Sequence, residues 1–351
     1  MRKPSMMRAA GLLVAACLAV GIASAQSPAV NPSEADYAKE QQKQQVAQPL
    51  NNQPVWKEVR SGLPQVTTVQ GRETNVLIQS QGQTWRAVRV PVATVGGFLV
   101  ALALASLAVF HAISGQVKSE SKPGERLIQR FEPADRWAHW VLASIWVTCA
   151  ITGLILSLGK SVLLPLVGYT LFSWLATFAK NLHNFFGPIL FFAVPWVFAR
   201  FVRSNIMGVD DFRWFAHMSD YFKGREYPSG KFNGGEKVHF WLAMPLAAVL
   251  VVSGLILVFP NFDQTRATMQ WSNIIHMVTA YLAIAGACVH VYLGTIGVQG
   301  ALEGMRDGYV DETWAEHHHA HWYHDVVAGK AREKFAEPGA APSAGAAGRP
   351  A

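Results

Sequence analysis

Five long apolar stretches leave few folds open to this chain. They run over residues 91–113, 137–158, 184–202, 240–259 and 274–297. Each has about the 20 residues that an α-helix needs to cross the hydrocarbon core of a bilayer. Tryptophans lie at the ends of several stretches, as is typical of helices that end at a membrane interface: Trp137, Trp140, Trp241 and Trp271. We therefore predict an all-α membrane protein.

The composition favours the same class. The 351 residues are 51% hydrophobic and only 15% charged, whereas about 25% is usual for a soluble domain. The net charge is +7, but the basic residues flank the apolar stretches, which indicates membrane orientation rather than a nucleic-acid partner. Covalent haem attachment is excluded because no Cys-x-x-Cys-His motif is present. No cysteine cluster for an iron–sulfur centre exists either.

The N-terminal part is predicted to lie outside the cytoplasm. Residues 1–25 have the basic start, short apolar run and small-residue cleavage site of a signal peptide. Residues 26–90 form a polar extracytoplasmic segment, and 91–113 form an extra transmembrane helix. A core at 114–310 and a cytoplasmic, His-rich and disordered tail at 311–351 complete the predicted organisation.

The loop charges give the orientation. The loops at 114–136 and 203–239 are rich in Lys and Arg, and the loops at 159–183 and 260–273 are not. The two basic loops are therefore predicted to be cytoplasmic. Residues 161–179 are also apolar, and counting them as a span would reverse this pattern. We interpret them as an interfacial or re-entrant segment, broken at Pro165 and Gly168.

Histidines within the apolar stretches indicate a cofactor. His276 and His290 are 14 residues apart, which on one helix is roughly 21 Å of rise with the side chains only ~40° apart. A neutral imidazole in lipid needs a partner, and paired ligation of a haem iron is a strong one. His139 begins the second stretch on the predicted cytoplasmic side, and His183 precedes the third on the outer side. Depth pairs His139 with His290 and His183 with His276, which predicts two b haems.

Other histidines leave alternatives open. His111 and His239 lie at cytoplasmic span ends and could compete as ligands, but neither has a depth-matched partner, so we treat both as interfacial. The histidine run at 317–324 could bind a metal, although its Trp and Tyr favour contact with a partner or surface. A His-lined metal or proton transporter is a different class of function. The spans carry almost no carboxylates, which argues against it.

Several motifs, in order along the chain, resemble the cytochrome b (gamma) subunit of respiratory membrane-bound formate dehydrogenases. They lie at 130–140, 181–187, 231–237, 275–276, 290–305 and 314–323, so the resemblance covers roughly 125–330. The resemblance implies a four-helix transmembrane di-haem bundle, here with one extra N-terminal helix. It also implies that His139 and His290 ligate the cytoplasmic-side haem, and that His183 and His276 ligate the outer haem.

The resemblance further implies a quinone site at Asn233 and Gly235, with His290 adjacent. Glu236 stands where some members of the family are expected to have an amide. Cationic partners for the haem propionates would come from Arg130, Arg136 or Arg203.

The implied role is that of an electron-transfer and quinone-reducing subunit in a bacterial inner membrane. Formate would be oxidised in a molybdenum or tungsten (alpha) subunit, since no motif for that chemistry is present here. Electrons would pass through an iron–sulfur (beta) subunit to the outer haem, the inner haem and a quinone, with protons taken from the cytoplasm. The nearest alternative is the cytochrome b subunit of a hydrogenase or thiosulfate reductase.

Overall fold

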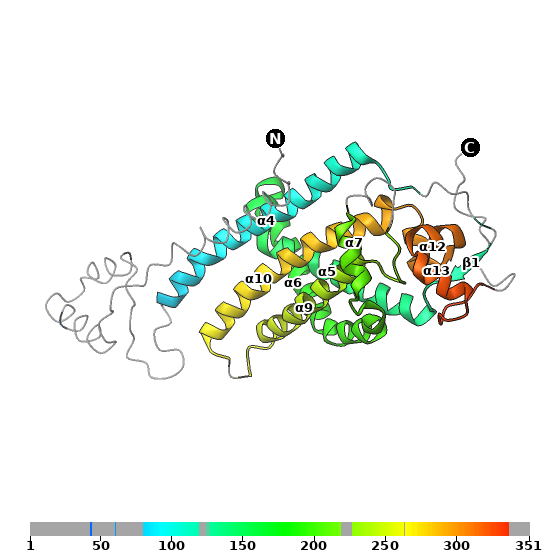
Figure 1. Ribbon diagram of the computed structural model, residues 1–351. Helices are drawn as coiled ribbons and strands as arrows, with labels where there is room; N and C mark the ends of the chain where they lie inside the picture. Colours follow the sequence, from blue (N-terminus) through cyan, green and yellow to red (C-terminus); the bar gives the residue numbers. More distant parts are fainter. Residues whose placement is uncertain are drawn as a thin grey trace. The chain divides into compact units, whose positions relative to one another are not determined.

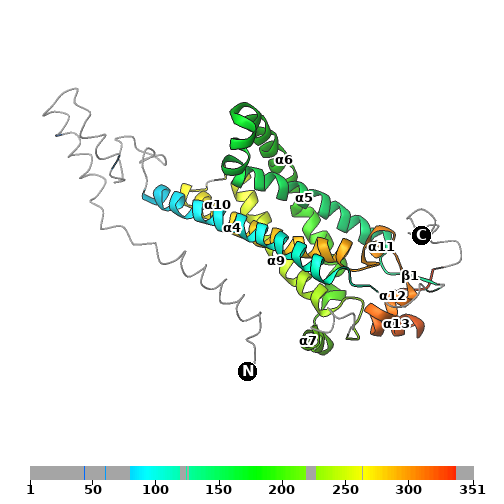
Figure 2. The same ribbon diagram turned by 90° about the horizontal axis from the view of Figure 1, so that it is seen from above.

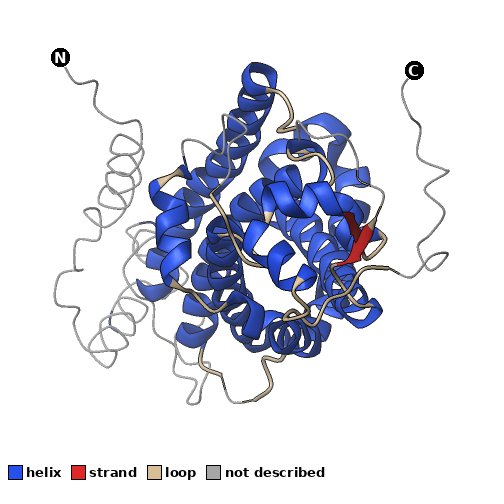
Figure 3. Cartoon of the chain, turned by 45° about the vertical axis from the view of Figure 1, so that its right-hand side comes forward, coloured by secondary structure: helices blue, strands red, loops and turns tan. Residues whose placement is uncertain are grey.

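The computed structural model describes residues 80–118, 126–218, 227–262 and 264–336, together with residues 43, 60 and 124 (Figure 1). The predicted signal peptide and most of the segment at 26–90 lie outside the described residues. Apart from one pair of short strands, the regular structure of the described part is helical (Figure 3).

Within the described residues, five helices are long and apolar enough to cross a membrane. They are α4 (Ser80–Ser114), α5 (Pro133–Val162), α6 (Leu164–Phe201), α9 (Gly234–Val258) and α10 (Arg266–Tyr292). The shorter helices are α7 (Val209–Ala216), α11 (Ala301–Arg306), α12 (Glu312–His318) and α13 (Ala320–Val327). A 3-10 turn, η1 (Val202–Asn205), follows α6, and a π-helical turn, η2 (Leu293–Gly297), follows α10. The prediction of an all-α membrane protein is confirmed.

Of the five long helices, α4 and α6 begin farthest before the apolar stretches that they contain. Helix α4 begins at Ser80 and continues through Pro91, so its first turns lie in the segment expected to be a polar extension. Helix α6 has its one non-helical residue at Gly168, with φ of 76°. From Tyr169 to Phe201 the helix continues through Pro188 and Pro195 without another non-helical residue. Residues 169–179 therefore belong to the same helix as the third predicted span and are not separated from it by a loop.

The chain divides into two compact units. The smaller unit contains the described residues up to Val95 and those from Gln264 to Ile274. Within it, Trp85 Nε1 donates a hydrogen bond of 3.2 Å to Asn273 Oδ1. The larger unit, from Gly96 to Phe262 and from Ile275 onward, contains the four predicted haem ligands.

Helices α5, α6 and α9 form the apolar core of the larger unit (Figure 2). One cluster of buried side chains contains Ile145, Leu190, Ala193, Val194, Ala247 and Val251. A second contains Phe131, Ala138, Val197, Phe201 and Phe240. The outer faces of the long helices instead expose large apolar side chains, among them Trp174, Phe192 and Leu242. Burial of a helix core with apolar groups left outside is what a lipid environment allows.

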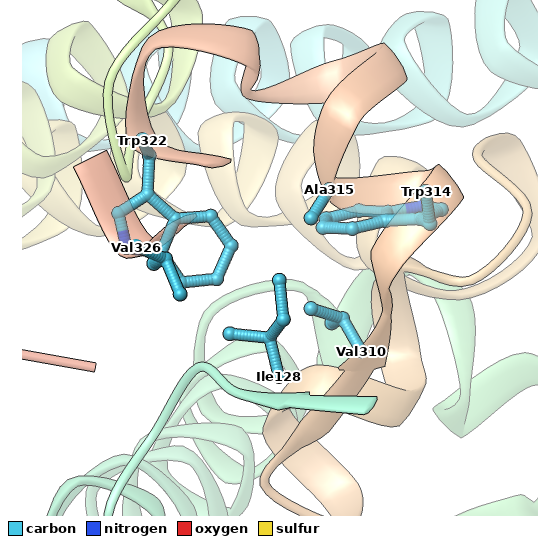
Figure 4. Close-up of a cluster of buried hydrophobic side chains, with 6 residues drawn as sticks. All are labelled: Ile128, Val310, Trp314, Ala315, Trp322 and Val326. Carbon is cyan, nitrogen blue, oxygen red and sulfur yellow. The ribbon is translucent and has the colours of Figure 1, made fainter. Parts of the chain in front are cut away.

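The chain after α10 folds against the residues that precede α5. Strand β1 (Leu127–Gln129) pairs antiparallel with β2 (Tyr309–Asp311), which sets Ile128 opposite Val310. Figure 4 shows Ile128 among Val310, Trp314, Ala315, Trp322 and Val326. We call these six residues the strand cluster. The segment expected to be a disordered tail thus contains α12 and α13, and the tryptophan of each helix is buried in the strand cluster. Residues from 337 on lie outside the described part.

Candidate functional site

The first histidine pair joins the beginning of α5 to the end of α10. The ring centroids of His139 and His290 are 6.1 Å apart, with the ring planes at 53°. His290 is exposed, and His139 is half-buried. The Nδ1 atom of His139 is buried and has no hydrogen-bond partner among the described residues. The predicted pair is therefore brought together across two helices.

The second pair joins α6 to the first half of α10. The ring centroids of His183 and His276 are also 6.1 Å apart, with the planes at 75°. Both rings are half-buried, and each Nδ1 lies 2.9 Å from a hydroxyl oxygen. The hydroxyl of Thr152 on α5 serves His183, and that of Ser253 on α9 serves His276.

Both separations fit a metal ion held between two imidazoles. A metal–nitrogen bond is about 2 Å and the ring centre lies about 1 Å beyond the nitrogen, so two opposed ligands place their centroids about 6 Å apart. His276 and His290 are both on α10, and their 14-residue spacing separates the pairs by roughly 21 Å along that helix. The donor set therefore fits one haem at each of two levels.

His239, named above as a possible competing ligand and then treated as interfacial, lies beside the first pair. Its ring on α9 stacks on that of His290, with centroids 4.4 Å apart and planes at 4°. From the sequence, histidines were paired by their predicted depth in the membrane. A third histidine at the same depth as a complete pair was therefore left without a partner. His111 has another environment, since its Nδ1 lies 3.2 Å from the hydroxyl of Tyr292.

Asn233 and Gly235 lie at the start of α9. Asn233 is the N-cap, whose Oδ1 accepts a 2.9 Å hydrogen bond from the backbone N–H of Glu236. In return, the backbone N–H of Asn233 donates to Glu236 Oε2 at 2.8 Å, which completes a capping box. A Cβ at Gly235 would lie 3.0 Å from the ring of Trp214. No hydrogen bond joins either residue to His290 in the described part; the link is α9 itself, which carries His239 one turn after Glu236.

Arg130, one of the three candidate propionate partners, is already engaged. Its side chain is only 4% exposed and donates to the carbonyl of Lys231 at 2.8 Å and to Glu236 Oε1 at 3.3 Å. Four aromatic rings surround the guanidinium at 5.0–6.0 Å: those of Phe131, Phe232, Trp314 and Trp322. Arg136 donates to the carbonyl of Arg306 at 2.9 Å, whereas Arg203 is exposed.

Two tail histidines are buried beside this arginine. Burial lowers the pKa of His318 to about 4, and the nearby charge of Arg130 acts in the same direction. His319 is also buried, and the same two causes place its pKa well below the ordinary value. Its Nδ1 lies 2.8 Å from the carbonyl of Gly230. The contact surface expected for the tail histidines is thus, for these two, on the chain itself.

Comparisons with known proteins agree on one family. Residues 130–308 match the prokaryotic cytochrome b561 family. The chain is 30% identical over 223 residues to the cytochrome b556(Fdn) subunit of the nitrate-inducible formate dehydrogenase of Escherichia coli K12, covering 60% of this chain and 97% of that protein. It is 27% identical over 227 residues to the formate dehydrogenase cytochrome b556 subunit of Haemophilus influenzae, covering 62% and 90%. The family match contains all four paired histidines, and α4 precedes it.

Proposed function

The chain belongs to the prokaryotic cytochrome b561 family as a membrane cytochrome b subunit of the formate dehydrogenase type, and we propose that it carries electrons from formate oxidation to a membrane quinone. One observation supports this role most directly. Two histidine pairs, each with centroids 6.1 Å apart, share helix α10 and are separated along it by most of a membrane's thickness.

The four histidines hold the cofactors in this proposal. His139 and His290 ligate one haem b near the cytoplasmic face, and His183 and His276 ligate a second near the outer face. When bound, the haems carry electrons from an iron–sulfur (beta) subunit to the cytoplasmic side, where a quinone accepts them. The α5, α6 and α9 side chains that separate the two levels are apolar and exclude water.

The start of α9 is the proposed quinone site. Asn233 and Gly235 stand one to two helical turns before His239, which is stacked on His290. The carboxylate of Glu236 lies beside Asn233, is 39% exposed and is ion-paired with Arg130. Cytoplasmic proton uptake paired with inward electron flow would separate charge across the bacterial inner membrane.

The partners follow from the relatives. In this proposal formate is oxidised in a molybdenum or tungsten (alpha) subunit outside the cytoplasm, the side on which the sequence predicts the N-terminal segment. Because the relatives named above are subunits of formate dehydrogenases, they favour formate over hydrogen or thiosulfate as the electron source. The cytochrome family likewise disfavours the alternative of a metal or proton transporter.

A visible difference spectrum tests the proposal. The purified full-length protein is expected to show a b-type band on reduction and to contain two haems per chain. Formate should reduce both haems only in the presence of the partner subunits, and added quinone should reoxidise them. A protein without a b-type band, or with haem that quinone leaves reduced, would contradict the proposed function.

A further inference from the structure

Two hydroxyl groups contact the second histidine pair in the same way. Thr152 Oγ1 lies 2.9 Å from His183 Nδ1, and Ser253 Oγ lies 2.9 Å from His276 Nδ1. Both hydroxyl residues are 4% exposed. They come from different helices, α5 and α9, and serve rings on two others, α6 and α10. The arrangement therefore recurs on opposite sides of one cofactor position.

Each hydroxyl also has a carbonyl partner within its own helix, to which it can donate its one hydrogen. Thr152 Oγ1 donates to the carbonyl of Thr148 at 2.7 Å, and Ser253 Oγ donates to that of Val249 at 2.6 Å. A hydroxyl has one hydrogen and two acceptor lone pairs, so toward the imidazole each oxygen can only accept. With the hydroxyl hydrogen directed at the carbonyl, Nδ1 of each histidine carries the proton and donates it to the hydroxyl oxygen. The lone pair then resides on Nε2, the atom left to bind a metal.

A glycine beside each hydroxyl lets the ring approach the helix backbone. Gly153 follows Thr152 and Gly254 follows Ser253. A Cβ at Gly153 would lie 3.2 Å from Cε1 of His183, and a Cβ at Gly254 would lie 3.2 Å from Cε1 of His276. These distances are tighter than ordinary van der Waals contact, so the glycines keep both rings at hydrogen-bonding distance from the hydroxyls.

The first histidine pair lacks this support in the described part of the chain. His139 Nδ1 is buried with no hydrogen-bond partner, and His290 has a stacked ring, that of His239, against it. The two cofactor positions thus differ in what holds the ligands, although their centroid separations are equal.

We propose that Thr152 and Ser253 are positioning residues that fix the ligating tautomer of His183 and His276 and thereby lower the reduction potential of the haem between them. The inference rests on the proposed function, because it requires that haem. A hydrogen bond from Nδ1–H makes an imidazole a stronger electron donor, which favours the oxidised iron. Loss of the acceptor oxygen should therefore raise the potential of one haem only.

The test uses the purified full-length protein with both haems bound. Thr152→Val and Ser253→Ala remove the acceptors with little change of volume. Each should shift the midpoint potential of one haem upward in a redox titration and change the low-spin signal of that haem in electron paramagnetic resonance. Thr148→Val is the matched control: its hydroxyl bonds to the Ser144 carbonyl one turn earlier and is not hydrogen-bonded to a ring. It should leave both haems unchanged.

The conservative variant Thr152→Ser separates the hydroxyl from packing. If Thr152→Val loses a haem outright, Thr152→Ser should retain it with a potential near that of the parent. Unchanged potentials and signals in Thr152→Val and Ser253→Ala would overturn the inference, as would equal shifts in Thr148→Val or haem loss in Thr152→Ser. Failure of the parent protein to bind two haems would instead contradict the proposed function.

Discussion

His239 and His290 lie face to face, with ring centroids 4.4 Å apart and ring planes only 4° apart. His239 is thus nearer to His290 than the proposed co-ligand His139 is, at 6.1 Å. Stacked rings offer their faces to each other rather than their nitrogens, so this contact cannot place a metal between them. The rings of His139 and His290 are tilted rather than stacked, and their 6.1 Å centroid separation fits two ligands of one metal ion, so the proposed ligand set follows from that difference.

Exchange of His239 should therefore spare both haems. His239→Phe keeps a flat ring against His290, and we expect two haems per chain in the purified variant, as in the parent. His139→Phe should lose one, because it removes an iron ligand. Haem content by absorbance against protein concentration measures both. The reverse pattern, with loss in His239→Phe alone, would move the ligand role from α5 to α9.

Removal of one ligand on α10 should isolate each haem. His290→Ala is expected to retain one haem, at the His183–His276 level, and His276→Ala to retain the other. Added quinol should then reduce the remaining haem in His276→Ala but not in His290→Ala. The haem that His276→Ala retains, between His139 and His290, is the one beside the proposed quinone site. Equal reduction by quinol in both variants would be inconsistent with a single quinone site beside His290.

Asn233 combines a cap with a proposed quinone contact, and two substitutions separate the roles. Asn233→Ala should cost about 1 kcal/mol of stability because the N-cap is lost, whereas Asn233→Ser keeps a capping oxygen. If the amide also binds quinone, both variants should raise the KM for quinone about fivefold, the value of about one hydrogen bond. Thermal unfolding and steady-state kinetics of the complex measure the two effects. If Asn233→Ser has the same KM for quinone as the parent protein, the role of Asn233 is limited to capping the helix.

The strand cluster should loosen in acid. The pKa of His318 is about 4 in the folded chain and about 6.5 when exposed, so the unfolded segment binds the proton more strongly. This difference in proton binding lowers the free energy of unfolding. The loss is absent above about pH 6.5 and grows as the pH falls toward 4, reaching about 2 kcal/mol by pH 5. Amide hydrogen exchange of residues 309–327, corrected for intrinsic rates, should reveal the loss. His318→Gln should reduce this loss of protection, and substitution of the exposed His324 by Gln should not. Equal protection of the parent protein at pH 5 and above pH 6.5 would contradict the prediction.

The membrane-spanning fold could be predicted because length and apolarity suffice to identify such helices. Four of the five predicted stretches lie entirely within helical segments of the structure, and the fifth, 240–259, extends one residue beyond the end of α9 at Val258. The exact start of α6 could not be predicted from the sequence. Gly168 breaks the helix locally, while the apolar residues on both sides of it remain helical. The folding of α12 and α13 was also beyond the sequence pattern. It depends on Ile128 and Val310, which are far apart in the chain and meet only through β1 and β2.

The histidine pairing was accessible from sequence because helix rise converts spacing into depth. Depth says nothing of azimuth, the direction in which a side chain leaves its helix. The stacking of His239 and the contacts of Thr152 and Ser253 depend on azimuth, so they emerged only with the packed helices. The engagement of Arg130 by four rings has the same origin, because two of the rings come from the tail.

The strand cluster also imposes an order on synthesis. Ile128 is made before helices α5 to α10, and the residues that cover it, from Val310 to Val326, are made after them. Every membrane-crossing helix has therefore left the ribosome before the fold can close. A chain that stops before Val310 would leave Ile128 without its apolar cover and Arg130 without two of its aromatic contacts. The strand cluster can therefore form only in a chain that has been translated at least as far as Val326.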